Sequence, residues 1–267
     1  MNAPLRGPTR NTDMRTCAFV LVLCLALAGC GAKGASRGGS SNMGSKEVDL
    51  RLNLVESHIN NSQYQLALQE LLKVEDAAKH MSRFHFDSGM IYLGLQELEQ
   101  SREGFTRAVE IDDDFGEAWN NLGKIEEALG RDKEAEAAYR KAFSILTYVT
   151  PEFSAYNLGV LLLRQGRAKE AEEFGRKALA RNWLYIPAYK LLSDAFVAQN
   201  RLDDAEAVLR SGLEADMNST PTILALAEHQ MRMGKTTEAA VLFDRIVKQY
   251  PNSSEAKVAR DYLDFLQ

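Results

Sequence analysis

The stretch GEAWNNLGKIEEALGRDKEAEAAYRKAFSIL, residues 116–146, decides the fold predicted for this chain. Its first part, Gly116 to Leu129, and its last part, Glu134 to Leu146, both place apolar residues at helical spacing. A short polar turn, GRDK, joins them. Small side chains recur where two helices must approach closely, and large ones fill the space beside them: Gly123, Ala135 and Ala142, then Trp119, Leu122 and Tyr139. The stretch therefore predicts a pair of packed α-helices.

This helix pair recurs along the chain with a period of 34 residues. Equivalent residues keep the spacing on both sides of a two-residue insertion near Pro151: Gly89 and Gly123, Phe105 and Tyr139, and Ala171, Ala205 and Ala239. A period of this length indicates a solenoid, in which each pair buries its apolar face only against its neighbours. Six units fit the sequence, with predicted boundaries at 48–81, 82–115, 116–149, 152–185, 186–219 and 220–253.

The repeat resembles the tetratricopeptide repeat. The resemblance is carried by residues of the third, fourth and sixth units: Trp119, Leu122, Gly123, Ala135, Tyr139, Ala142, Leu158, Gly159, Ala171, Ala178, Ala239, Phe243 and Pro251. The first and fifth units depart from the expected pattern at Val55, Val74, Ser193 and Gly212. The resemblance implies an all-α tetratricopeptide-repeat solenoid of six helix pairs. Residues 254–267 place apolar side chains at helical spacing, so we expect a capping helix there, with a partner-binding tail as the alternative.

Residues 1–29 have the profile of a secretory signal peptide. Arg6, Arg10 and Arg15 supply positive charge ahead of an apolar segment, residues 17–28, which is shorter than the roughly 20 residues of a membrane-spanning helix. All three cysteines of the sequence lie within its first 30 residues. The rest of the chain therefore has neither a disulfide nor a cysteine-ligated metal.

The sequence from Leu27 to Cys30 resembles the lipobox of bacterial lipoproteins. The resemblance implies cleavage before Cys30 and attachment of lipid to its thiol, and several acyl chains would hold the protein on a membrane almost permanently. Gly31 stands where an aspartate would retain an enterobacterial lipoprotein at the inner membrane, so we expect a lipid-anchored protein on the periplasmic face of the outer membrane. An ordinary signal peptide cut elsewhere, or an N-terminal anchor helix, is the alternative. Met14 is a second candidate start of the chain.

The mature chain predicted from residue 30 onward has a flexible beginning and an acidic body. Residues 30–47 form the predicted tether, because residues 31–46 contain five glycines and four serines. Such a coil spans about 20 to 25 Å. Removal of the leader leaves 29 Lys and Arg residues against 36 Asp and Glu residues, a net charge of −7. This balance argues against nucleic acid or an anionic membrane surface as the partner.

The sequence offers no motif with catalytic or metal-binding spacing. The string GKTT, residues 234–237, lacks the earlier glycine of a phosphate-binding loop and falls on a predicted turn. The run Asp112 to Asp114 lacks the alternating ligands, glycine and glutamate of a calcium loop. The four histidines show neither the paired spacing nor the neighbouring cysteines of a zinc site: His58, His80, His85 and His229. We therefore expect no enzyme, no cofactor, no metal ion and no small-molecule substrate.

A partner protein is expected to bind in the concave groove of the solenoid. The first helix of each pair lines that groove, and its inward positions are apolar in units 1, 2 and 4: Leu52, Ile59, Phe86, Met90, Leu93, Phe153, Tyr156, Val160 and Leu163. The third unit presents polar residues there instead: Glu117, Asn120, Lys124 and Glu127. An apolar strip of this kind suits a partner segment that covers it. For Leu93 and Leu163, burial between units is an equally open alternative.

The segment LTYVTPEFSAYNLG, residues 146–159, resembles an insertion found in the type IV pilus pilotins, the PilF/PilW and Tgl lipoproteins. Tyr148, Thr150, Pro151, Asn157 and Gly159 carry this likeness, and the order of parts agrees as well. The resemblance implies a non-enzymatic outer-membrane lipoprotein that helps subunits of the pilus secretin to assemble into their multimeric pore. The alternative is a repeat adaptor for another envelope machine, such as barrel assembly or peptidoglycan synthesis and hydrolysis.

Overall fold

The computed structural model describes residues 44–266. Within that range the chain forms fourteen α-helices and no β-strand. The helices are α1 (Ser45–Asn60), α2 (Tyr64–Leu72), α3 (Glu75–Ala78), α4 (Ser82–Gly94), α5 (Leu98–Ile111), α6 (Gly116–Ala128), α7 (Asp132–Ser144), α8 (Pro151–Arg164), α9 (Ala168–Arg181), α10 (Pro187–Ala198), α11 (Leu202–Ala215), α12 (Thr220–Arg232), α13 (Thr236–Gln249) and α14 (Ser254–Phe265). The predicted signal peptide and Cys30 lie outside the described residues.

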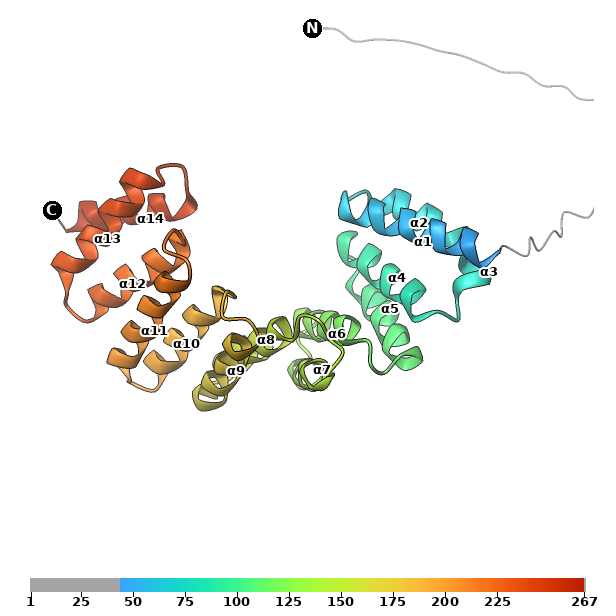
Figure 1. Cartoon of the computed structure of the whole chain (residues 1–267), viewed down its shortest axis with the longest axis horizontal. Coiled ribbons are helices and arrows are strands. Elements are labelled where there is room, and N and C mark those ends of the chain that lie inside the picture. The colour runs from blue at the N-terminus through green and yellow to red at the C-terminus, as the bar shows by residue number, and fades with distance from the viewer. Residues whose placement is uncertain (1–43, 267) are drawn as a thin grey trace, which may run out of the picture. The chain divides into compact units, whose positions relative to one another are not determined.

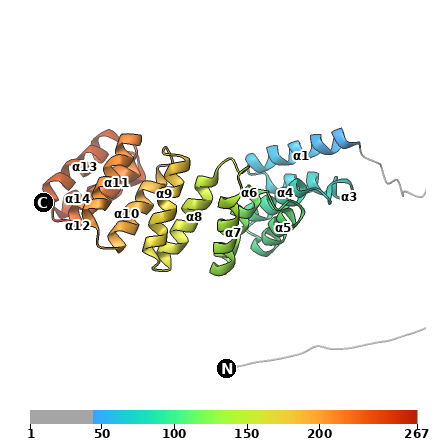
Figure 2. The ribbon, with the colours of Figure 1, turned by 60° about the horizontal axis from the view of Figure 1, so that its bottom comes forward.

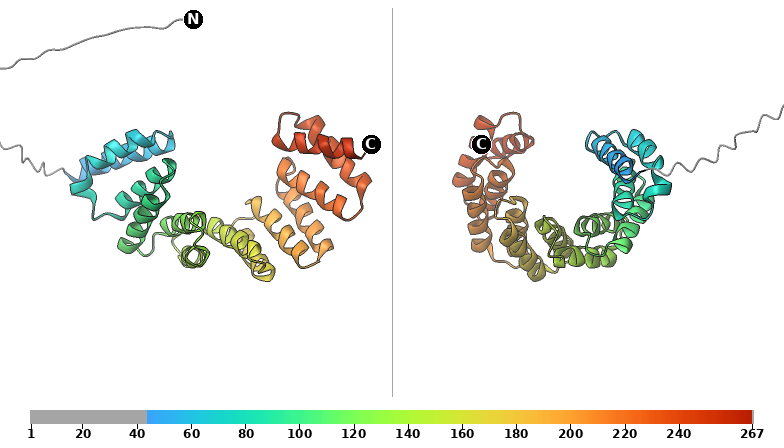
Figure 3. Two further views of the ribbon diagram at one scale, coloured as in Figure 1. Left: turned by 180° about the vertical axis from the view of Figure 1, so that it is seen from behind. Right: turned by 45° about the vertical axis from the view of Figure 1, so that its right-hand side comes forward.

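The helices pair as the 34-residue period predicts, and the all-α solenoid is confirmed. Each pair packs on the next, so that residues 44–266 form one curved row (Figure 1). Figure 2 shows α7 to α11 standing side by side across the row. In Figure 1, α6 and α8 follow the inner side of the curve and α7 and α9 the outer side. Figure 3 shows the open inner side from two further directions.

The first unit differs from the others. Its second helix, α2, is followed by the short helix α3 before the chain enters α4. Helix α1 begins at Ser45, so the last three residues of the range predicted for the tether, 30–47, are helical. No helix described by the structure is both long and apolar enough to cross a membrane.

The two helices of a pair approach closely because glycine faces an aromatic ring. A Cβ atom placed on Gly123 would lie only 2.6 Å from Cδ1 of Tyr139, and one on Gly89 would lie 2.7 Å from Cδ1 of Phe105. These separations are far below van der Waals contact, so a larger residue would push the helices apart. The rings of Tyr139 and Phe105 are almost completely buried, and they anchor the core of units 3 and 2.

The last pair is covered by α14. Its Ala256 and Ala259 are fully buried against α12 and α13, and the ring of Tyr262 stacks on Phe243 with centroids 4.6 Å apart. The Ser253 hydroxyl accepts a hydrogen bond of 3.1 Å from the backbone N–H of Ala256 and so begins the helix. This is the helix that the sequence predicts over residues 254–267.

An ion-pair ladder joins units 2 to 6 along the edge where the two helices of a pair are connected. In each of four successive units, the basic residue that opens the second helix reaches a glutamate in the second helix of the preceding unit. The four pairs are Arg131 with Glu99 at 3.0 Å, Arg167 with Glu136 at 2.6 Å, Arg201 with Glu172 at 2.8 Å and Lys235 with Glu206 at 2.6 Å. Units 1 and 2 hold Gln63 and Glu97 at the equivalent turn positions. The first basic residue of the ladder is therefore Arg131 of unit 3, and no ladder pair joins units 1 and 2.

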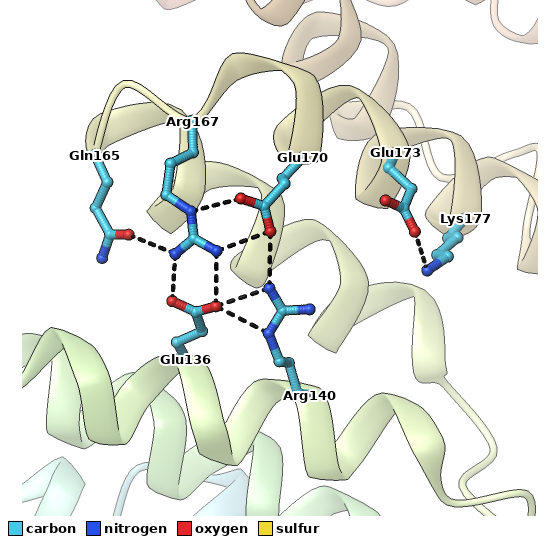
Figure 4. Close-up of polar contacts among 7 residues, drawn as sticks. All are labelled: Glu136, Arg140, Gln165, Arg167, Glu170, Glu173 and Lys177. Atoms are coloured by element: carbon cyan, nitrogen blue, oxygen red, sulfur yellow. Dashed lines mark hydrogen bonds and ion pairs between the residues drawn. The ribbon is translucent and has the colours of Figure 1, made fainter.

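The ladder is densest between units 3 and 4 (Figure 4). Arg167 donates to Glu136 of α7 and, over 2.7 Å, to Glu170 of α9. Arg140 donates to Glu136 over 2.7 Å and to Glu170 over 3.1 Å, so two guanidinium groups share two carboxylates. The hydrogen bonds from the guanidinium of Arg167 hold the pKa values of both Glu136 and Glu170 below the ordinary range. Both carboxylates therefore stay charged at neutral pH.

Candidate protein-binding groove

The inner side of units 1 to 4 contains three adjoining pockets. The first, here called the acidic pocket, has a volume of about 420 Å³ and is lined by Glu56, Ile59, Asn60, Ser82, Arg83, Phe86, Asp87, Met90, Asp112, Phe115 and Glu117. The central pocket, of about 400 Å³, is lined by Glu117, Asn120, Asn121, Lys124, Tyr148, Thr150, Phe153, Asn157 and Tyr185. The third pocket, of about 410 Å³, is lined by Lys124, Glu127, Ala128, Tyr139, Tyr156, Asn157, Val160 and Arg164. Because neighbouring pockets share lining residues, the three form one groove.

Six of the residues predicted to line the groove do so. Ile59, Phe86 and Met90 line the acidic pocket, Phe153 lines the central pocket, and Tyr156 and Val160 line the third. Their contact with a partner remains a prediction. Leu93 lines none of the three pockets and packs, half-buried, against the core of units 2 and 3, and Leu163 packs in the same way against the core of unit 4.

The prediction for Leu52 is wrong. Its side chain is completely buried in the core of units 1 and 2, where no partner can reach it. Leu52 lies three residues before Val55 and therefore shares the face of α1 that packs on α2 and α4. The adjacent stripe of α1 faces the groove and carries Glu56 and Ile59. The side chains of α1 that line the acidic pocket are Glu56, Ile59 and Asn60, whereas Leu52 lies in the core.

Aromatic rings form the apolar parts of the groove. In the acidic pocket, the ring of Phe86 lies 4.8 Å from that of Phe115 and 5.6 Å from the buried ring of Phe105. Phe86 is thus partly a core residue. In the central pocket, Tyr185 stands edge-on to Phe153 at 5.2 Å and to Tyr156 at 5.3 Å. Burial raises the pKa of Tyr185 to about 12, so its hydroxyl stays protonated at neutral pH.

Polar groups between the rings are largely paired with one another. Asn157 donates a hydrogen bond of 3.1 Å to Asn120 across α8 and α6. Tyr139 donates to Glu127 over 2.9 Å, and Arg164 donates to the same carboxylate over 2.7 Å. The middle of the groove therefore has a fixed polar floor. Asn120 and Lys124 line the central pocket, and its lining holds no further lysine and no arginine.

Asp87 is the residue of the groove that sequence reasoning missed. It lines the acidic pocket from α4, yet it is only 4% exposed, and its Oδ2 atom has no hydrogen-bond partner. The nearest cation is Arg83, whose Nε lies 4.0 Å from Oδ2. Burial raises the pKa of Asp87 to about 7, against an ordinary value of 3.8. A signal was available in the sequence, because the equivalent positions of units 1, 3 and 4 hold Asn53, Asn121 and Asn157.

Arg83 offsets the burial of this carboxylate only in part, because its Nη2 is hydrogen-bonded elsewhere. Its Nη2 donates to Asn53 over 2.7 Å and to Glu56 over 2.9 Å, both on α1. Three further carboxylates line the same pocket: Glu56, Asp112 and Glu117. Against four carboxyl groups the pocket offers one guanidinium, so its electrostatic potential favours cations.

Residues of the histidine set, the GKTT string and the aspartate run occupy ordinary positions in the helices and turns. His229 is buried, and its Nε2 lies 2.9 Å from the carbonyl oxygen of Leu202. Gly234, the first residue of GKTT, lies in the turn between α12 and α13 with a φ of 75°. Asp112 accepts a hydrogen bond from the backbone of Asp114 over 3.1 Å, within the turn before α6. Across residues 44–266, no group of three or more His, Cys, Asp or Glu side chains is placed to hold a metal ion.

Comparison with known proteins agrees with this architecture. Family profiles described as tetratricopeptide repeat match residues 86–144, 162–221 and 222–253, which together make up more than half of the chain. No match is found among curated protein sequences. The fold is similar to the crystal structure of PilW, a widely conserved type IV pilus biogenesis factor, with 21% identity and a TM-score of 0.70 over 80% of this chain and 99% of PilW.

Two other solved structures are similar as well. PilF of Pseudomonas aeruginosa is 17% identical, with a TM-score of 0.67 over 80% of this chain and 96% of PilF. YrrB, described as a TPR protein with an unusual peptide-binding site, is 18% identical, with a TM-score of 0.54 over 72% of this chain and 97% of YrrB. At these identities the likeness shows a shared fold. From its repeats and its architecture, the chain belongs to the tetratricopeptide-repeat family.

Proposed function

We propose that this chain is a non-enzymatic scaffold of type IV pilus biogenesis that promotes assembly of the secretin in the outer membrane. The observation that carries the proposal is the similarity to PilW and PilF over four fifths of this chain and nearly all of theirs. The groove supports it, because it combines apolar rings with a fixed polar floor, as a surface for an extended or helical protein segment requires.

In this proposal two parts of the chain do separate work. The groove of units 1 to 4 captures a segment of the secretin subunit. Lipid on Cys30 holds the pair at the periplasmic face of the outer membrane, where the ring must form. Because recognition and anchoring use different residues, each can be removed without the other.

Deletion of the gene tests the function directly. We expect heat-resistant secretin multimers to disappear from an immunoblot of the deletion strain and to return with the unsubstituted gene. Normal multimers in the deletion strain would reject the pilotin role and favour an adaptor for another envelope machine.

A pair of matched substitutions tests the groove. Val160→Asp places a charge in the third pocket at a side chain that is 36% exposed, and Val241→Asp places the same charge on α13 at one that is 64% exposed. We expect Val160→Asp to lower secretin multimers and Val241→Asp to leave them unchanged, with equal helicity by circular dichroism. Equal multimer levels in the two strains would place recognition outside the third pocket.

The anchor is tested by Cys30→Ala, which removes the thiol that takes the lipid. We expect the substituted protein to leave the membrane fraction after an alkaline wash. Retention at the level of the unsubstituted protein would reject lipid anchoring through Cys30.

A further inference from the structure

The acidic pocket contains a buried carboxylate, Asp87, whose Oδ2 has no hydrogen-bond partner. Asp87 is 4% exposed, its Oδ2 accepts no hydrogen bond, and it lines a cavity of about 420 Å³. A buried carboxylate of this kind is unfavourable unless a donor or a cation reaches it. The neighbouring polar groups of the groove are paired, so Asp87 is the exception in its surroundings.

The one cation that lines the pocket, Arg83, makes no hydrogen bond to Asp87. The Nε atom of Arg83 lies 4.0 Å from Oδ2 of Asp87, beyond the length of a hydrogen bond, and its Nη2 donates to Asn53 and Glu56 instead. The other charged lining residues are Glu56, Asp112 and Glu117, which repel an anion. No cluster of ligands for a metal ion occurs in residues 44–266. The remaining chemistry that fits is an organic cation.

The apolar part of the pocket defines the shape of that cation. Ile59, Phe86, Met90 and Phe115 line the cavity beside Asp87. A lysine or arginine side chain has an alkyl stem that packs on apolar surface and a charged end that pairs with a carboxylate. Aromatic rings such as Phe86 and Phe115 also attract a cation that lies over their faces.

We infer that the acidic pocket receives a lysine or arginine side chain of the partner segment, with its stem on Phe86 and Met90 and its charge on Asp87. The inference rests on the proposed function only in that the basic residue belongs to a protein bound in the groove. It specifies that partner segment: a basic residue enters at units 1 and 2, and apolar residues lie farther along it, beside Phe153, Tyr156 and Val160 of unit 4.

The repeat supplies a conservative variant. Asn53, Asn121 and Asn157 occupy the position of Asp87 in units 1, 3 and 4, so Asp87→Asn installs an amide that the same fold accommodates three times. It removes the charge and keeps the shape. Asp244→Asn, on α13 and outside the groove, removes a charge of the same kind as a control.

The test uses n-hexylammonium, which carries the ammonium of lysine on an alkyl chain, and n-hexanol, which is neutral and of the same length. Both are titrated into residues 30–267 bearing Cys30→Ala, which retain the whole compact unit of residues 42–267. Binding is followed through the ¹³C-methyl resonance of Met90. We expect n-hexylammonium to bind about tenfold more tightly than n-hexanol, and Asp87→Asn to abolish that preference while Asp244→Asn preserves it.

Two outcomes would overturn the inference: equal affinities for the two probes in the protein that retains Asp87, or an undiminished preference in Asp87→Asn. The first comparison needs no change in the pocket, so it holds even if Asp87→Asn impairs folding. Neither measurement involves the secretin. A strain without the gene that keeps normal multimers would therefore reject the proposed function while leaving the inference about the pocket to stand on the probe data.

Discussion

The ion-pair ladder and the acidic pocket use charge in opposite ways. In the ladder each basic residue meets a glutamate of the preceding unit, and Arg167 with Arg140 shares two carboxylates between them. In the acidic pocket, Asp87 is more deeply buried than any ladder residue, and its Oδ2 has no hydrogen-bond partner. The difference teaches that charges which position the repeats are satisfied within the chain, whereas the unsatisfied charge lies where a partner can reach it.

The largest expected effect comes from breaking the most buried pair of the ladder. Glu206 accepts from Lys235 over 2.6 Å and from Arg210 over 2.6 Å, and these hydrogen bonds lower its pKa to about 2. We expect Glu206→Gln to lower the free energy of unfolding by about 3 kcal/mol in urea titrations at pH 7. Glu99→Gln, at the exposed end of the ladder, is the matched control and should cost less than about 1 kcal/mol.

The opposite sign is expected for the acidic pocket. At pH 8 the carboxyl group of Asp87 is charged and buried, so Asp87→Asn should raise the free energy of unfolding by about 2 kcal/mol. At pH 5, where Asp87 is protonated in the folded chain, the gain should vanish. Urea titrations at both pH values check this, and a loss of stability at pH 8 would show that Asp87 has an internal partner.

The two sites also predict opposite dependences on pH. Folding raises the pKa of Asp87 from 3.8 to about 7, so the stability it contributes is complete below pH 3.8 and is lost as the pH rises through 7. Arg83 opposes this rise in pKa and Glu56 supports it, while Asp112 and Glu117 line the same pocket. Between pH 5 and 7 this group should lower stability by about 1 kcal/mol per pH unit.

Glu206 behaves in the reverse sense. Its pKa falls from 4.5 to about 2 on folding, so its contribution is present above pH 4.5 and is lost as the pH falls toward 2. Urea midpoints measured from pH 3 to 8 in the unsubstituted chain and in each variant separate the two slopes. Asp87→Asn should remove only the decline between pH 3.8 and 7. Glu206→Gln should remove part of the decline below pH 4.5 only.

The smallest expected change in the free energy of unfolding comes from the turn between α4 and α5 of unit 2, which has no basic residue of the ladder. Gln96 has a φ of 65°, where glycine occupies the equivalent places at Gly130, Gly166 and Gly234. Because a side chain is strained in this left-handed region, Gln96→Gly should raise the free energy of unfolding by about 0.5 kcal/mol. Gly130→Ala is the mirror-image control and should lower it. Thermal unfolding of both variants checks this. An unchanged unfolding temperature in Gln96→Gly would show that the turn at Gln96 is not strained.

The 34-residue period was sufficient to predict the helix pairs and their order along the chain. Spacings such as Gly123 with Tyr139 encode a close helix contact directly, so the pairs and their order followed from them. The assignment of Leu52 failed because spacing alone does not show which stripe of α1 packs on α2 and α4, and Leu52 lies in that stripe with Val48 and Val55. Asp87 was not predicted for another reason. Whether it has a hydrogen-bond partner depends on the contacts of Arg83, which donates to Asn53 and Glu56 on another helix, and the sequence does not show those contacts.

The ladder begins at unit 3, and this has a mechanical consequence. The joint between units 1 and 2 carries no rung at the turn edge and is bridged instead by Arg83, reaching from α4 to α1 beside the acidic pocket. A cation bound at Asp87 would interact electrostatically with Arg83 and with Glu56. A cation bound at Asp87 would therefore act on the arginine that ties α4 to α1, at the joint within residues 44–266 that has no ladder pair.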